Sequence, residues 1–323
     1  MQVPRRFLID TDTASDDAVA LIMALHHPDV DVLAITIVAG NVPVAQAARN
    51  ALYTAELCGS QVPVYPGARH PLLREYMDAE WFHGKDGLGD HNYPAPRRAP
   101  EPVHAVDAII ETVRANPGIT LVTLGPLTNV ALALARAPEI AANVGRAVVM
   151  GGAPCCEGNV TPAAEYNFWV DPEAARMVAR SGLPIELVGW HLCRGAAALD
   201  PADIEHVLGL ATPRARFAIE CNSTAMAAYR VQTGENGISL PDPVAMSIAL
   251  DPPICTSASA HYLDVETVSD LTRGMTVVDR LDVAGNHRNR DIWKQALEGP
   301  KARICWTIDI PRWKQALYAA LAG

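Results

Sequence analysis

No apolar run in this 323-residue sequence is long enough to span a bilayer, and basic residues are in the minority. Lys and Arg number 26 against 36 Asp and Glu, which gives a formal net charge of −10. An acidic chain is a poor partner for nucleic acid or an anionic membrane surface, so we expect it to bind neither. Because residues 1–6 lead directly into an apolar run, we expect no signal peptide and a cytoplasmic location.

Cysteine is also sparse and shows no recognisable spacing. The seven cysteines, an odd number, include the neighbours Cys155 and Cys156 but no Cys-x-x-Cys pair. This pattern indicates neither a disulfide framework nor a zinc site. We expect most of these residues to be buried as small hydrophobic side chains.

Apolar runs of strand length alternate with amphipathic runs of helical length along most of the chain. This alternation predicts βαβ units and a mainly parallel, open, Rossmann-like sheet with helices on both faces. Half of the residues are hydrophobic, and no linker-like segment divides the chain. We therefore predict an α/β protein of one domain, residues 1–323, with a small antiparallel extension. The expected strands end at Ile9 or span 32–38, 119–124, 147–150 and 185–189, with an antiparallel pair at 262–268 and 275–281. The expected helices follow Ser15 as N-cap, span 44–57, 127–135, 172–181 and about 201–231, and begin again at Pro243.

Two long loops interrupt this alternation, at residues 66–102 and 151–171. The first is rich in Pro, Gly and His, and the second in Gly, Asn and Cys. Loops of this length in a compact domain are usually functional or disordered. We expect both to contribute groups that bind a ligand.

Four aspartates gather where the first strand gives way to the first helix. Asp10 and Asp12 follow the strand, where parallel sheets bind ligands, and Asp16 and Asp17 fall in the first turn of the helix. A helix N-terminus stabilises one or two carboxylates. Four neighbouring carboxylates repel one another and need a cation, a shared proton or hydrogen-bond donors. The cluster therefore predicts a metal site.

Two other types of site also place several aspartates close together in the sequence. The segment that begins at Asp10 is not an EF-hand loop. Its sixth residue is Ser15, where an EF-hand has Gly, and its twelfth is Leu21, where an EF-hand has Glu. The haloacid-dehalogenase type of phosphatase has a strand ending in Asp-x-Asp, in which Asp10 would be the nucleophile and Asp12 the acid. That match is short and leaves Asp16 and Asp17 without a role.

A set of short motifs, in order over about 230 residues, resembles the inosine-uridine type nucleoside hydrolases. Together they identify the chain as a member of that family, although each is weak alone. The motifs are Asp10-Thr11-Asp12 with Asp16-Asp17, Gly40-Asn41, His83-Gly84, Gly87-Leu88, Leu124 to Asn129, Met150 to Gly152, Gly158-Asn159, Glu165 to Asn167, Asp171 to Ala175, and Asp242 to Val244.

The resemblance implies hydrolysis of the N-glycosidic bond of ribonucleosides with a bound Ca²⁺. It assigns the cation to Asp12, Asp17, Asp242 and the backbone carbonyl of Leu124. These are oxygen ligands, which suit a hard cation, and the chain shows no His or Cys cluster that would favour zinc. By the same resemblance Asp12 is the general base that activates water, and the enzyme is a homodimer or homotetramer.

The resemblance also implies a ribose site and its support. It places Asp10 behind the site as an orienting carboxylate, and His83 facing the ligand from the first long loop. Carboxylates and amides suit a sugar, because each buried hydroxyl needs a partner. The residues assigned to the ribose are Asp16, Asn41, Asn159, Glu165 and Asn167.

One position departs from the family pattern. Many members have a histidine directly before the late metal-binding aspartate, where it helps to protonate the departing base, but this chain has Pro241. Proline cannot donate a proton, so base preference and the leaving-group acid stay open. His191 is one candidate acid, and Trp81, Trp190 and Tyr229 are candidates for stacking on the base. A catalytically weak ribonucleoside or ribose sensor is the alternative outside the enzymes.

Overall fold

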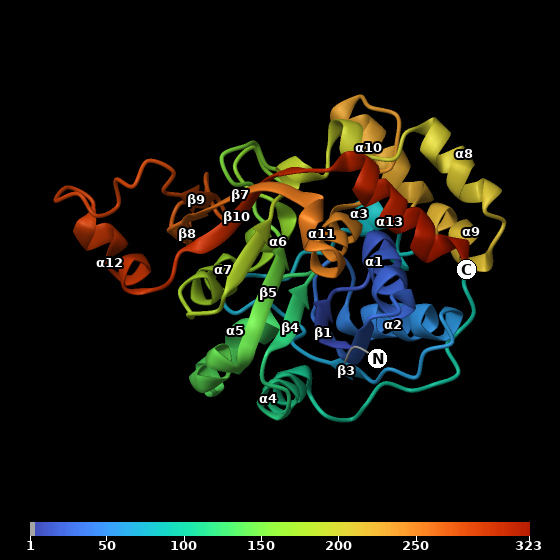
Figure 1. Cartoon of the computed structure of the whole chain (residues 1–323), viewed down its shortest axis with the longest axis horizontal. Coiled ribbons are helices and arrows are strands. Elements are labelled where there is room, and N and C mark those ends of the chain that lie inside the picture. Colours follow the sequence, from blue (N-terminus) through green and yellow to red (C-terminus); the bar gives the residue numbers. More distant parts are fainter. Residues whose placement is uncertain (1–3) are drawn as a thin grey trace.

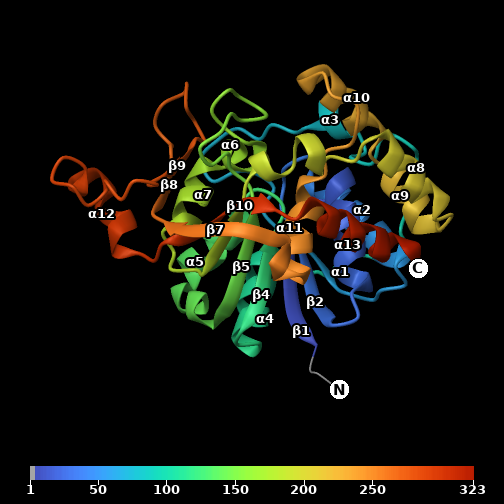
Figure 2. The same cartoon turned by 45° about the horizontal axis from the view of Figure 1, so that its top comes forward.

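An eight-stranded sheet in the order β3-β2-β1-β4-β5-β6-β10-β7 forms the centre of the computed structural model, which describes residues 4–323 (Figures 1 and 2). Met1 to Val3, part of the segment for which we expected no signal peptide, lie outside the described residues. Within the described part, β7 alone runs antiparallel to its neighbour in this sheet. The strands are β1 (Arg5–Thr11), β2 (Val30–Ile37), β3 (Val64–Pro66), β4 (Ile119–Thr123), β5 (Val144–Met150), β6 (Ile185–Val188), β7 (Cys255–His261) and β10 (Ala302–Ile308).

Helices cover both faces of the sheet because the strands bury apolar side chains on both sides. In β1, Phe7 and Ile9 pack in the cluster under α1, α2, α11 and α13, whereas Leu8 packs in the cluster under α4, α5 and α7. The helices are α1 (Ser15–His26), α2 (Val44–Leu57), α3 (Glu80–His83), α4 (Ala105–Ala115), α5 (Thr128–Arg136), α6 (Tyr166–Val170), α7 (Pro172–Ala179), α8 (Pro201–Gly209), α9 (Pro213–Glu220), α10 (Ser223–Thr233), α11 (Pro241–Leu250), α12 (Arg290–Glu298) and α13 (Ile310–Ala322).

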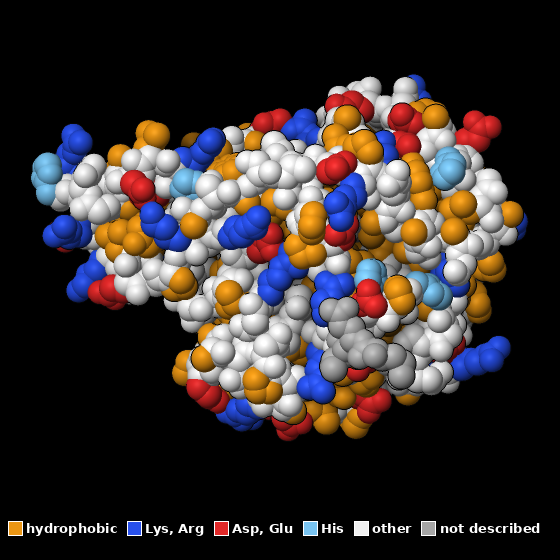
Figure 3. Space-filling model, in the orientation of Figure 1, with side chains coloured by type: hydrophobic (Ala, Val, Ile, Leu, Met, Phe, Trp, Pro, Cys, Tyr) orange, Lys and Arg blue, Asp and Glu red, His pale blue; other side chains and the backbone are white. Residues whose placement is uncertain are grey.

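A small antiparallel pair, β8 (Leu263–Val265) and β9 (Thr276–Val278), forms the expected extension. Together with α12 it makes an arm that projects from the body at the left of Figure 1. Basic and apolar side chains are both visible on this arm in Figure 3. None of the helices within residues 4–323 has the length and apolar character needed to cross a membrane.

The sheet changes its direction of growth at β1. Strands β2 and β3 lie on one side of β1, and β4, β5 and β6 lie on the other. In doubly wound sheets, ligands bind outside the carboxyl ends of the strands at this switch point. Asp10 pairs with Thr36 in β2 and with Thr123 in β4, so the aspartate cluster begins at this edge of the sheet.

The predicted α/β fold with its parallel sheet is confirmed, and the helix 44–57 has the predicted bounds. Two helix starts were wrong. The N-cap of α1 is Ala14, because the backbone N–H of Ala14 donates to Asp17 Oδ2 (2.9 Å), while the Ser15 hydroxyl bonds to His83. Helix α11 begins at Pro241 rather than Pro243, since proline is compatible with a first helical turn.

The segment expected to be helical from about 201 to 231 divides into α8, α9 and α10. Pro201 and Pro213 begin new helices because each lacks a backbone N–H and fixes φ for a first turn. The expected loops 66–102 and 151–171 also contain one short helix each, α3 and α6.

Candidate active site

Five buried carboxylates meet at the carboxyl end of β1. Asp10 lies near the end of that strand and Asp12 directly follows it. Asp16 and Asp17 occupy the first turn of α1, and Asp242 comes from the first turn of α11. All five are at most 7 % exposed. One carboxylate oxygen from each of Asp16, Asp17 and Asp242 lies within 4.8 Å of the other two. The start of α11 therefore completes a cluster that the start of α1 begins.

The cluster is not neutralised by basic side chains. Within the described residues, none of its carboxylates forms a salt bridge with Lys or Arg, and Asp16 has only His83 at 3.9 Å. Burial raises the pKa of Asp12 and Asp242 well above the usual range, and the neighbouring Asp17 raises both further. Burial raises the pKa of Asp16 to about 6. Raised pKa values of this kind indicate that the cluster needs a positive partner.

Asp12 supplies the observation that tests whether a cation fits. Its Oδ2 accepts a hydrogen bond from the backbone N–H of Asn41 (2.6 Å), but its buried Oδ1 has no partner within the described residues. The charged groups near it are the carboxylates of Asp16, Asp17 and Asp242, and oxygen is the ligand that a hard cation such as Ca²⁺ prefers. The residues present therefore fit such an ion.

Gly40 and Gly125 make room for the side chain of Asp12. A Cβ on Gly125 would lie 2.6 Å from Asp12 Oδ1, closer than real side chains approach. The carbonyl of Leu124, just before Gly125, accepts a hydrogen bond from Asn167 Nδ2 (2.8 Å). This contact joins the end of β4 to the second long loop.

Asp10 is anchored away from the pocket. Its Oδ1 accepts hydrogen bonds from Thr36 Oγ1 (2.6 Å) and from Asn129 Nδ2 (2.9 Å), and burial raises its pKa to about 7. The Asn129 amide also donates to the carbonyl of Ile37 (3.0 Å). Asp10 thus ties β1 to β2 and α5 rather than facing a ligand, which is a poor position for an attacking nucleophile.

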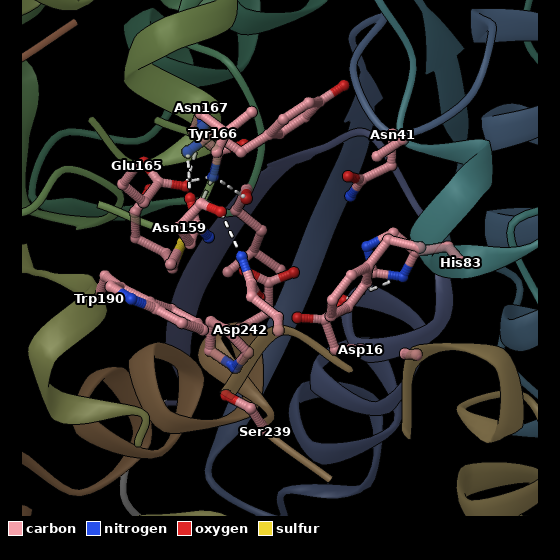
Figure 4. Close-up of a pocket in the computed structure, with 18 of the residues that line it drawn as sticks. Asp16, Asn41, His83, Asn159, Glu165, Tyr166, Asn167, Trp190, Ser239 and Asp242 are labelled. Atoms are coloured by element: carbon pink, nitrogen blue, oxygen red, sulfur yellow. Dashed lines mark hydrogen bonds and ion pairs between the residues drawn. The ribbon is translucent and has the colours of Figure 1, made fainter. Parts of the chain in front are cut away.

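A pocket opens directly above the carboxylates (Figure 4). In Figure 4, Asn159, Glu165 and Asn167 lie on one side, Asn41 and His83 on the other, and Asp16 and Asp242 below. Both long loops contribute, as expected. All six residues that the resemblance assigned to the substrate line the pocket, together with Leu124 and Asp242, whereas Asp10, Asp12 and Asp17 lie outside its lining.

The second long loop is held in place by its own polar groups. Glu165 caps α6, and its side chain accepts from the N–H groups of Asn167 (2.8 Å) and Gly152 (2.7 Å). Asn159 Oδ1 accepts from the N–H of Tyr166 (2.9 Å). Burial raises the pKa of Glu165. These bonds fix the side chains of Glu165 and Asn159 at one wall of the pocket.

A family model described as "Inosine-uridine preferring nucleoside hydrolase" matches residues 7–315. The chain belongs to this family. It is therefore a ribonucleoside hydrolase, an enzyme that acts on N-glycosyl compounds. The family is metal-dependent in general, in agreement with the oxygen-rich cluster.

Curated relatives and solved structures agree with this nucleoside hydrolase assignment. The pyrimidine-specific ribonucleoside hydrolase RihA of Shewanella sp. (strain ANA-3) is 41 % identical over 291 residues, covering 89 % of this chain and 91 % of that protein. RihA of Klebsiella pneumoniae (strain 342) is 39 % identical over 285 residues, covering 87 % and 91 %. Among solved structures, a plant nucleoside hydrolase has a TM-score of 0.90 at 31 % identity, covering 99 % of both chains. A purine-preferring ribonucleoside hydrolase from Gardnerella vaginalis has a TM-score of 0.87 at 29 % identity, covering 99 % and 98 %.

Part of the hydrolase pocket is built by groups other than the assigned ribose residues. Trp81 and Trp190 line it, as the stacking hypothesis requires, and Pro241 lines it too. Two other candidates were wrong. The side chain of His191 bonds through Nε2 to the carbonyl of Cys305 (3.0 Å), and Tyr229 is fully buried against Glu235, so neither lines the pocket.

His83 lies in the pocket as an uncharged group. Its Nδ1 is 2.8 Å from the hydroxyl of Ser15, and burial lowers its pKa to about 4. At neutral pH the imidazole is therefore in its neutral form, which is a poor acid, and it shares a hydrogen bond with Ser15.

Sequence reasoning missed three polar residues of the pocket, Asn222, Gln232 and Ser239. The amide of Asn222 donates to the carbonyls of Ser15 (3.3 Å) and Ala218 (2.9 Å). Gln232 reaches across from α10 to the carbonyl of Asn159. No motif signals these residues, because they reach the pocket only through tertiary packing, in which α10 lies against α3.

Proposed function

We propose that this nucleoside hydrolase cleaves the N-glycosidic bond of pyrimidine ribonucleosides with a bound Ca²⁺ and with Asp12 as general base. The observation that carries the proposal is the unpartnered Oδ1 of Asp12, buried among carboxylates without a basic neighbour and beneath a polar pocket. The pyrimidine preference is supported by the RihA relatives, whose printed name is pyrimidine-specific.

The proposed cation ligands are Asp12, Asp17, Asp242 and the carbonyl of Leu124. When bound, such a cation makes a water molecule more acidic and attracts the ribose hydroxyls. Asp12 can serve both as a ligand of the cation and as the general base. One of its oxygens is fixed by the Asn41 N–H, and the other is free. Asp17 is held by Thr11 Oγ1 (2.5 Å) and by the N–H of Ala14, which fixes its direction.

The ribose would be recognised by Asp16, Asn41, Asn159, Glu165 and Asn167, and His83 would face the ligand near the base. Asn167 holds one amide N–H on the Leu124 carbonyl, so its position is tied to the proposed ligand set. Asp10 would support the site by fixing the carboxyl end of β1 against β2 and α5. Asp12 Oδ1 would take the proton of the attacking water, and no covalent intermediate is required.

Chelation and substitution together test this proposal. Protein purified without added metal should contain one Ca²⁺ per chain, and chelation should abolish release of reducing sugar from uridine. Asp12→Asn keeps the shape of the side chain but removes its basicity, so turnover should fall by about 10²-fold or more. Zinc in the active protein, full activity after chelation, or an active Asp12→Asn variant would each contradict the proposal. A homodimer or homotetramer and a cytoplasmic location stay predictions.

A further inference from the structure

A second group of metal-binding side chains lies under the far end of the sheet. It consists of Cys255 in β7, Cys305 in β10 and Glu186 in β6. Their two sulfurs and one carboxylate oxygen lie within 4.8 Å of one another, and the residues are at most 8 % exposed. We propose that these three residues bind a thiophilic divalent cation of the zinc type, at a site separate from the carboxylate cluster.

The register of the strands explains why the three side chains meet. Glu186 pairs with Arg303 in the parallel β6–β10 pair, and side chains two residues apart share a face, so Glu186 and Cys305 are on the same side of the sheet. The β10–β7 pairing is irregular after Cys305, next to the start of β7 at Cys255. Cys255 pairs with Ile308, three residues beyond Cys305, and its sulfur nevertheless lies within 4.8 Å of the Cys305 sulfur. Cys255 and Cys305 both pack in the cluster on the α11 and α13 face.

The chemistry of the donors favours a softer ion than the one proposed for the pocket. Thiolate sulfur binds zinc-type ions tightly, whereas Ca²⁺ prefers oxygen. Sulfur and oxygen ligands bind zinc at about 2.3 and 2.1 Å. Atoms on one tetrahedral ion would then be about 3.5 to 4 Å apart, so the three side chains need only small movements to share it. The two cysteines would each release one proton as the ion binds.

Glu186 is already oriented for this role. Arg146 binds its Oε2 (2.7 Å from Nε), and Arg303 donates to its Oε1 (3.2 Å). The Cys305 thiol donates to the same Oε1 at 3.6 Å. Loss of the thiol proton would free a lone pair of Oε1 for the ion. Carboxylate ligands are commonly fixed by hydrogen bonds of this kind.

The local net charge is +1 both without the ion, when the thiols are neutral and Glu186 is paired with Arg146 and Arg303, and with the ion bound. Two thiolates and Glu186 carry three negative charges, and Arg146 and Arg303 offset two of them. A divalent ion would leave a net charge of one, which the partly exposed Arg303 shares with solvent.

Cadmium is the probe, because sulfur-to-cadmium charge transfer gives an ultraviolet absorption band. The Ca²⁺-loaded enzyme would carry Cys155→Ser and Cys156→Ser, which removes the neighbouring thiols that are exposed or half-buried. One Cd²⁺ per chain should bind with this band, and Zn²⁺ should compete for it. In this background Cys255→Ser and Cys305→Ser should each weaken binding by about 10²-fold or more. Cys58→Ser, which changes a half-buried thiol elsewhere in the molecule, is the matched control and should change nothing.

A second measurement keeps the test independent of folding in the variants. With all seven cysteines intact and alkylation run near the Tm, where buried thiols become exposed, Cd²⁺ should slow the modification of Cys255 and Cys305 in peptide mapping more than that of Cys58. The proposal is overturned if the background protein shows no band, if the band persists unchanged in both variants, or if Cys255 and Cys305 stay unprotected. Because the enzyme keeps its Ca²⁺ throughout, nucleoside cleavage reports separately on the proposed function.

Discussion

A Cβ on Gly40 would lie 2.0 Å from Asp12 Oδ2, so this glycine and this aspartate occupy adjoining space that no larger residue can share. The next residue, Asn41, donates its backbone N–H to the same oxygen. The backbone after β2 therefore sets the position of the proposed general base.

Gly40→Ala should consequently displace Asp12 and impair catalysis without unfolding the protein. A misplacement of about 1 Å at a reacting group costs about 10²-fold in rate, and we expect a loss of that order in kcat. Gly209→Ala is the matched control, since a Cβ there meets nothing within 4 Å. Steady-state kinetics with uridine compare the two, and unchanged kcat in Gly40→Ala would refute the close packing.

Asp16 and Asp17 should differ in what they lose on substitution. Asp17 lies outside the pocket lining and Asp16 lies within it, although both approach Asp242. Asp17→Asn should lose Ca²⁺ and activity together, whereas Asp16→Asn should keep most of its Ca²⁺ and raise KM for uridine. Metal analysis of both variants beside kinetics decides the matter. If Asp16→Asn loses the ion and Asp17→Asn retains it, the proposed ligand set must exchange one aspartate for the other.

Chelated enzyme should become less stable as the pH rises from 6.5 to 8. Burial raises the pKa of Asp10 to about 7 and that of Asp12 and Asp242 well above the usual 3.8. A carboxyl with a raised folded-state pKa binds its proton more tightly in the folded chain, so its stabilising contribution is lost as pH rises towards that pKa. His83 acts with the opposite sign, but its effect fades above its unfolded pKa of 6.5, so it offsets only part of this loss at the lower end of the window.

Bound Ca²⁺ should reverse this trend, because its ligands must be ionised. The rise in Tm caused by Ca²⁺ should therefore be larger at pH 8 than at pH 6.5, measured by thermal unfolding with and without chelator. Asp242→Asn removes one of the raised carboxyls and should flatten the pH dependence of the chelated protein. An equal rise in Tm at both pH values would show that these carboxyls do not titrate as argued.

Removing the 2′-hydroxyl of the substrate should be costly. The pocket presents several carboxylates and amides where the ribose is expected, and a missing hydroxyl leaves buried polar groups without a partner. We expect 2′-deoxyuridine to react slower than uridine by about 10²-fold or more. Equal kcat/KM values for the two substrates would mean that these residues do not bind the 2′-hydroxyl of the ribose.

The lack of an acid at Pro241 predicts that rates follow leaving-group ability. A substrate whose leaving group needs no proton, such as p-nitrophenyl riboside, should be cleaved much faster than uridine or inosine. Pro241→His should narrow the difference, since it adds an imidazole at the pocket wall. His191→Ala is a control, because that side chain is outside the pocket lining. If His83→Ala abolished uridine cleavage but spared the nitrophenyl substrate, His83 would be the acid after all.

The motifs of the site could be recognised in the sequence because each depends on residues that are neighbours along the chain. A strand ending near Asp10 is followed within a few residues by a helix with acidic residues in its first turn. This local pattern predicts a ligand site independently of the rest of the chain. The helix at 44–57 and the parallel strands follow from periodicity in the same way. In contrast, β7 and β10 were not predicted. The residues of β7 are mostly small or polar and it lies at the sheet edge, so no apolar alternation marks it.

Contacts between distant segments were decided by the tertiary structure alone. His191 follows a predicted strand as a pocket residue should, yet it turns to the carbonyl of Cys305, whereas the unremarkable Asn222 reaches the pocket. Cys255 and Cys305 are about fifty positions apart, with no spacing that suggests a pair, and strand register brings them together with Glu186. Sequence by itself determined which residue types could do the chemistry and that the sheet would be parallel, because those depend on neighbours along the chain. Which side chains share a site depends on how strands and helices pack, and only the folded chain settles that.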